Sequence, residues 1–175
     1  MVSKSQDVFI LLKLLLTPVM KTYGELGAEL GMSASEVHSS VKRSTRAGLI
    51  HPKTFRPLRK PLEDYVLYGV PYAFPGVPGP VVRGMPTSYA ATPLREQLEV
   101  STDLPPVWPD AKDGTARGYT LEPLYPSAPF AARKDAKLYE LLALVDALRE
   151  GRAREKNLAI KELQNRISKL TNDTP

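Results

Sequence analysis

The sequence predicts a mainly helical fold with a small β component, and three observations support this class. Apolar residues recur at helical spacing near the N-terminus and again from Asp135 onward. Paired capping residues and turn glycines divide the N-terminal part into short helices. Fourteen of the 17 prolines lie between Pro57 and Pro129, where each removes a backbone donor and disfavours helix in the residue before it. We therefore expect helices at both ends of the 175-residue chain and mostly extended or looped structure between them.

The first two helices are predicted from their start and stop signals. The first begins at Ser5, has a broad apolar face and is stopped by Pro18. The second starts with a capping box, in which the side chains of Thr22 and Glu25 each cover a free amide of the first turn. This second helix ends at Gly31.

The third helix has start and stop signals of the same kind. Ser33 and Glu36 form its capping box, and it runs to Ala47, where Gly48 tolerates a left-handed backbone. Two short capped helices joined by residues 31–33 make a helix-turn-helix, in which the glycine permits the tight turn.

This helix-turn-helix has a family resemblance. The stretch from Tyr23 to Arg43, followed by Arg-Ala-Gly-Leu-Ile at 46–50, resembles the helix-turn-helix of bacterial winged-helix regulators of the MarR-like kind. The resemblance covers about residues 6–50. It implies a DNA-binding domain over residues 1–69 whose third helix is the recognition helix.

The third helix has two contrasting faces. If Val37 and Val41 face the core, the opposite face presents short polar groups near its start and cations further along. This distribution suits contacts with base edges and phosphates, whereas the alternative is an ordinary solvated face. The residues concerned are Ser35, His38, Ser39, Lys42, Arg43 and Arg46.

A basic segment follows the third helix. Winged-helix proteins continue here into a two-stranded hairpin, but prolines 52, 57 and 61 argue against paired strands in this sequence. We predict a basic loop that contacts phosphates in place of a wing, or else a plain linker. Its cations are Lys53, Arg56, Arg59 and Lys60.

Residues 70–134 form the predicted proline-rich middle region. A fourth helix from Pro61 to Gly69 leads into it, and Val70–Phe74 reads as a brief strand. The Asp-Gly step at 113–114 favours a short β-hairpin between residues 105–109 and 117–121.

Residues 135–175 predict a pair of amphipathic C-terminal helices separated by Gly151. Two uses of their apolar stripes are open: contact with a second copy of the chain, helped by Leu12 and Leu15 of the first helix, or closure of an intramolecular core. The residues available for either are Leu141, Leu142, Val145, Leu148, Leu163 and Ile167.

Composition excludes several function classes. The chain has no cysteine and only two histidines, so we expect no disulfide, no metal site and no cofactor. No nucleophile stands beside a base, so we expect no enzyme. The longest apolar run, residues 8–16, is too short to span a membrane, and a signal peptide is not evident. We therefore expect a cytoplasmic protein without membrane contact.

The net charge of +5 is divided unevenly, with basic ends and an acidic middle. Together these features predict a sequence-specific, double-stranded-DNA-binding transcriptional regulator that acts as a homodimeric repressor. The alternative is a protein-interaction module, antitoxin-like or adaptor, that grips a protein partner through its middle region or C-terminal helices and in which the helix-turn-helix is secondary.

Overall fold

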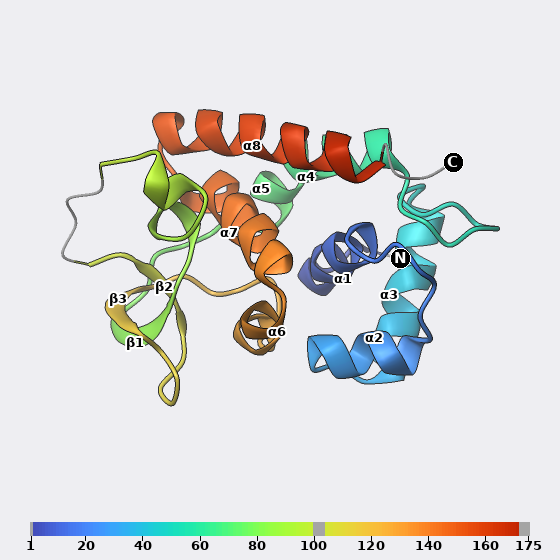
Figure 1. Ribbon diagram of the computed structural model, residues 1–175, viewed down its shortest axis with the longest axis horizontal. Helices are drawn as coiled ribbons and strands as arrows, with labels where there is room; N and C mark the ends of the chain where they lie inside the picture. Colours follow the sequence, from blue (N-terminus) through green and yellow to red (C-terminus); the bar gives the residue numbers. More distant parts are fainter. Residues whose placement is uncertain (1, 100–103, 172–175) are drawn as a thin grey trace.

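The computed structural model describes residues 2–99 and 104–171 (Figure 1). It is 56% helical with a small three-stranded sheet, which confirms the mainly α class with a small β component. In chain order the elements are α1 (Ser5–Leu15), α2 (Tyr23–Leu30), α3 (Ala34–Arg46), α4 (Arg59–Tyr68), α5 (Val70–Ala73), β1 (Val81–Pro86), the 3₁₀ turns η1 (Ser88–Ala90) and η2 (Leu94–Glu96), β2 (Pro106–Pro109), β3 (Ala116–Thr120), α6 (Ala128–Lys134), α7 (Ala136–Glu150) and α8 (Ala153–Thr171).

Helices α2 and α3 begin and end where their capping residues predict, and α1 begins at the predicted Ser5 and ends at Leu15, before Pro18. Thr22 caps α2 and Ser33 caps α3, each in a complete capping box with the glutamate three residues later. Gly31 ends α2 with φ of 69°, a left-handed conformation that glycine adopts without steric cost. Local hydrogen bonding therefore determines where these helices start and stop.

A miniature hairpin follows α3, where the sequence predicts an unpaired loop. The Leu58 amide donates to the Leu49 carbonyl (2.8 Å) and the His51 amide to the Arg56 carbonyl (2.9 Å). Between them, Ile50 and Pro57 form an antiparallel bridge. The amide that proline lacks is not needed at position 57. Both hydrogen bonds of the bridge use the residues on either side, Arg56 as acceptor and Leu58 as donor. The prolines therefore permit one isolated bridge, but no strand forms in the described stretch between α3 and α4, in agreement with the loop prediction.

The chain after α4 is helical rather than extended. The predicted fourth helix is present as α4, but the predicted strand at 70–74 is the short helix α5. Pro71 lies in the first turn of α5, where its missing amide would have no helical partner in any case.

The middle region contains three strands that close into a small ring. β1 pairs antiparallel with both β2 and β3, and these two pair parallel with each other. The predicted β2–β3 hairpin is therefore wrong, because the two strands pair in parallel, whereas the strands of a hairpin run antiparallel. A Cβ at Gly84 would lie 2.0 Å from the Trp108 carbonyl oxygen, and one at Gly118 would lie 1.8 Å from that of Pro105. These glycines allow the close strand approach that the ring needs.

A buried polar cluster attaches this ring to α7. The Asp146 carboxylate accepts hydrogen bonds from Trp108 Nε1 (2.7 Å), Thr87 Oγ1 (2.7 Å) and Arg149 Nη1 (2.6 Å). Arg149 also donates to the carbonyl of Phe74 (2.7 Å). The charges of Asp146 and Arg149 are thus paired inside the molecule, as buried charges must be.

α7 is the central helix of the fold. Every residue from 141 to 149 is buried, and α7 packs against α1, α5, α6 and α8. One hydrophobic cluster runs from α1 through α4 and β2 to α8. The three predicted regions, 1–69, 70–134 and 135–175 (described to residue 171), therefore share a single core.

The C-terminal apolar residues belong to this intramolecular core. At most 2% of each of the six is exposed: Leu141, Leu142, Val145, Leu148, Leu163 and Ile167. Leu12 is also fully buried and Leu15 is partly buried. These side chains therefore follow the second alternative, the intramolecular core, because α7 and α8 use them to cover one another and α7 also packs on α1. The homodimer itself stays a prediction. Figure 1 shows the resulting shape, with α3 and the hairpin at one end of the long axis and the strands at the other.

Candidate nucleic-acid interface

Helix α3 buries one face and exposes the other. Val37, Ser40, Val41 and Ser44 lie against the core. The opposite face carries five of the six predicted contact residues, all exposed: Ser35, His38, Ser39, Lys42 and Arg46. The helical spacing therefore predicts the direction of these five side chains correctly.

The five exposed side chains are polar groups without an internal polar partner. Within residues 2–99 and 104–171, none of them makes a hydrogen bond or an ion pair. The His38 ring packs against Tyr23 of α2, with ring centroids 5.3 Å apart. The outer face of α3 is thus a row of donors and acceptors available to a ligand.

Arg43, the sixth residue, points inward and is a correction to the predicted face. Its Nε lies 3.0 Å and its Nη2 lies 2.6 Å from carboxylate oxygens of Asp7, whose side chain is 1% exposed. Ser40 Oγ donates to the same carboxylate (2.7 Å), and so does the Lys4 amide (2.9 Å). The hydrogen bonds between Arg43 and Asp7 raise the pKa of Arg43 above its ordinary value. Arg43 therefore holds α3 on α1.

Sequence reasoning misassigned Arg43 because it lies at the border of the two helix faces. At 3.6 residues a turn, it is flanked by buried Ser40 on one side and exposed Ser39 on the other. A long side chain at such a border can turn either way, and the buried carboxylate of Asp7 determines its direction. The pairing of Asp7 with Arg43 has no local signal, since 36 residues separate the two.

The basic segment after α3 divides into exposed and internally bonded cations. Lys53, at the hairpin turn, and Arg59 are exposed. Lys60 is exposed too and pairs with Asp64 (2.7 Å), one helical turn along α4. Arg56 instead donates to the carbonyls of Thr17 and Pro18, so it attaches the hairpin to the loop between α1 and α2.

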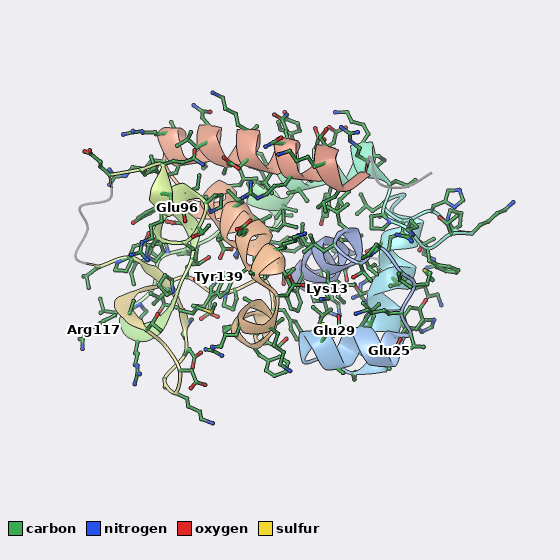
Figure 2. All side chains as sticks on the ribbon, viewed as in Figure 1. Lys13, Glu25, Glu29, Glu96, Arg117 and Tyr139 are labelled. Atoms are coloured by element: carbon green, nitrogen blue, oxygen red, sulfur yellow. The ribbon has the colours of Figure 1, made fainter. Side chains whose placement is uncertain are left out.

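An ion-pair network fixes α2 relative to the rest of the fold. Lys13 Nζ lies 3.0 Å from Glu29 of α2 and 2.8 Å from Asp135, the capping residue of α7. Glu29 also pairs with Lys21, and the two lysines hold the pKa of Glu29 below its usual range. Figure 2 shows Lys13 and Glu29 between α1 and α2. The base of the helix-turn-helix is therefore rigidly supported.

The middle region supports the start of α3. Tyr125 Oη donates to Glu36 (2.6 Å), which with the bonds from Ser33 lowers the pKa of Glu36. The Tyr125 ring also stacks on Phe9 of α1, with centroids 5.9 Å apart. Ser127 Oγ donates to the Leu30 carbonyl at the end of α2 (2.5 Å). These contacts have no local signal in the sequence, because they join segments between 89 and 116 residues apart.

The part of the chain that the structure describes holds no cluster of histidines and carboxylates that could bind a metal ion. Among the same residues, no helix combines the length and apolar character needed to cross a bilayer.

No protein-family model, curated protein or solved structure matches the chain. The resemblance of about residues 6–50 to MarR-like regulators therefore stays a prediction from the sequence.

Proposed function

We propose that the chain is a sequence-specific double-stranded-DNA-binding regulator of transcription, with α3 as its recognition helix. One observation carries the proposal: five polar side chains occupy one face of a rigidly mounted helix, and none has an internal polar partner. Contacts with α1, α2 and Tyr125 hold α3 in place beneath this face.

The order of side chains along α3 suits a major groove, which is wide enough to admit a helix. Ser35 and Ser39 are short and let the backbone approach base edges, and His38 can donate or accept. Lys42 and Arg46 extend further and reach guanine edges or phosphates. Direct readout of a short sequence by these five groups is the activity that we propose.

The hairpin follows α3 directly in the chain. Its turn carries the exposed Lys53, and Arg59 and Lys60 follow at the start of α4. We propose that these cations contact phosphates, which adds affinity and salt dependence rather than sequence preference. Arg56 has a supporting role in this scheme, because its guanidinium is bonded to two carbonyls.

Repression is the regulatory outcome that we propose, because a bound protein can block transcription by occupying the DNA alone. A homodimer that places two copies of α3 on DNA stays part of this proposal, but its interface would have to use other residues, since the C-terminal leucines lie in the core.

The test is fluorescence anisotropy with a labelled 25-base-pair duplex pool of random sequence at low salt. We expect the double variant K42A/R46A to bind much more weakly than the parent. The matched control K112A/R117A removes the same two charges from exposed residues of the strand region, and Arg117 lies at the opposite end of the molecule from α3 (Figure 2). Equal losses in the two variants would contradict a specific role for α3. Absence of binding by the parent would favour the protein-interaction module.

A further inference from the structure

A cavity of about 320 Å³ lies beside α3, on the side that faces the hairpin. Its walls come from the loop between α1 and α2, the start of α2, the inner face of α3 and the hairpin. Most of the lining is apolar, and the residues are Leu14, Thr17, Val19, Met20, Lys21, Thr22, Tyr23, Leu26, Val41, Phe55, Arg56 and Pro57.

Three large apolar side chains at this cavity are exposed to solvent. Val19 is 69% exposed, Met20 60% and Phe55 42%. Contiguous exposed apolar groups around a hollow mark binding sites on folded proteins. Phe55 also has φ of 55°, a left-handed conformation that a bulky L-residue rarely adopts. Strain of this kind is typically retained at ligand-binding positions.

Apart from the neutral hydroxyl of Tyr23, the polar side chains in the cavity wall are already bonded within the chain. Arg56 donates to the carbonyls of Thr17 and Pro18, and Lys21 pairs with Glu29. Thr17 Oγ1 donates to the Lys13 carbonyl. The hydroxyl of Thr22, the capping residue of α2, accepts a hydrogen bond from the Glu25 amide. The wall therefore offers no unpaired charge, and a charged ligand would lose hydration without gaining a partner.

The volume sets the size of the occupant. A dry cavity of roughly 150 Å³ lined by aliphatic and aromatic side chains holds one benzene molecule. A cavity about twice that size accommodates two fused aromatic rings or an aliphatic body of similar bulk.

We propose that this cavity is a binding site for an uncharged, apolar small molecule of about two fused rings. Any apolar extension of the ligand would meet the exposed side chains of Val19, Met20 and Phe55. An occupant would touch Val41 of α3 and Phe55 of the hairpin at once, so it would join the two elements of the proposed DNA surface.

The test is a fluorescence titration with N-phenyl-1-naphthylamine, a neutral probe that brightens in apolar sites. Its sulfonated relative 8-anilinonaphthalene-1-sulfonate has the same ring skeleton with a negative charge. We expect saturable binding of the neutral probe with a Kd at least tenfold lower than that of the sulfonate. The variants V19E and M20E place a charge at the exposed mouth and should each raise the Kd of the neutral probe at least tenfold. The matched control V77E changes a residue that is 71% exposed and outside the cavity wall, and should leave the Kd within twofold.

Three results would overturn the proposal: no saturable binding of the neutral probe, equal affinity for the sulfonate, or unchanged binding by V19E and M20E. Sedimentation of the parent as a dimer that M20E dissociates, without probe binding, would also overturn it and would assign the patch to a second copy of the chain. The changed residues are exposed, so folding is expected to survive, and far-ultraviolet circular dichroism checks this. The titration contains no DNA, so its outcome is separate from the outcome for the proposed function.

Discussion

Replacement of Arg43 by alanine should destabilise the fold and leave the DNA-reading face intact. The substitution leaves the carboxylate of Asp7 without its charged partner. Asp7 is 1% exposed and would keep only the hydroxyl of Ser40 and the amide of Lys4 as hydrogen-bond donors. Removing one member of a buried ion pair typically costs about 3–5 kcal/mol, because the other charge stays buried without compensation. A domain is commonly stable by only about 5–15 kcal/mol, so this is a large fraction of the total.

The matched control is R46A, which removes the same side chain one turn further along α3. Arg46 is exposed and has no polar partner among the described residues, so its loss should change stability by less than about 0.5 kcal/mol. Urea unfolding followed by circular dichroism measures both variants. With a urea m value of about 2 kcal/mol/M, R43A should lower the midpoint by roughly 2 M.

The two variants should differ in DNA affinity as well, but here R46A should be the weaker one. Under conditions where both are folded, R43A should bind duplex DNA as the parent does. The reasoning is refuted if R43A and R46A have equal unfolding midpoints, or if folded R43A loses as much DNA affinity as R46A.

Three further predictions concern the outer face, the hairpin and a buried acid. R46A should weaken binding to a preferred duplex by about 1–3 kcal/mol, measured by anisotropy, and no loss would remove Arg46 from the reading set. The double variant K53A/R59A should flatten the plot of log K against log salt by roughly two units, since each neutralised phosphate contributes a slope of about −0.9; an unchanged slope means that neither cation meets a phosphate. Burial raises the pKa of Glu150 above its ordinary 4.5 despite the hydrogen bond from Tyr119, so the folded chain binds this proton more tightly than the unfolded chain. Stability from this group is therefore present at low pH and is lost as pH rises through the raised pKa. E150Q should remove that loss, and parallel pH profiles of urea midpoints for parent and variant would contradict it.

Local hydrogen bonding explains why so much of the N-terminal third could be predicted. The side chains of Thr22 and Ser33 cap helices through partners three residues away, and Gly31 ends α2 through its own backbone conformation. The outward direction of Lys42 and Arg46 follows from helical spacing once Val37 is placed inside. None of these inferences needs a contact between distant parts of the chain.

The hairpin and the strand ring required information that the local sequence lacks. Whether Pro57 breaks a ladder depends on its register, and the register is set by the pairing of Leu49 with Leu58. Strand β1 contains Gly84 and Pro86, which argue against a strand until two other strands pack closely on it. The direction of Arg43 likewise depended on a carboxylate 36 residues away.

The C-terminal helices show a different limit of the sequence. An apolar stripe that contains Leu142 and Leu163 predicts burial but not the surface that covers it. In the structure the covering surface comes from the same chain, because α7 packs against both α1 and α8. The same stripe would look identical in a dimer.

Selection of bound sequences from random duplex DNA tests the central claim most directly. We expect the parent to enrich one short motif and K42A/R46A to lose this enrichment, whereas K112A/R117A should enrich the motif of the parent. Substitution of Ser39, which lies in the middle of the reading face, should shift the base preference within that motif. Failure of the parent to enrich any motif, or enrichment of the same motif by K42A/R46A, would contradict the assignment of α3 as the reader of DNA.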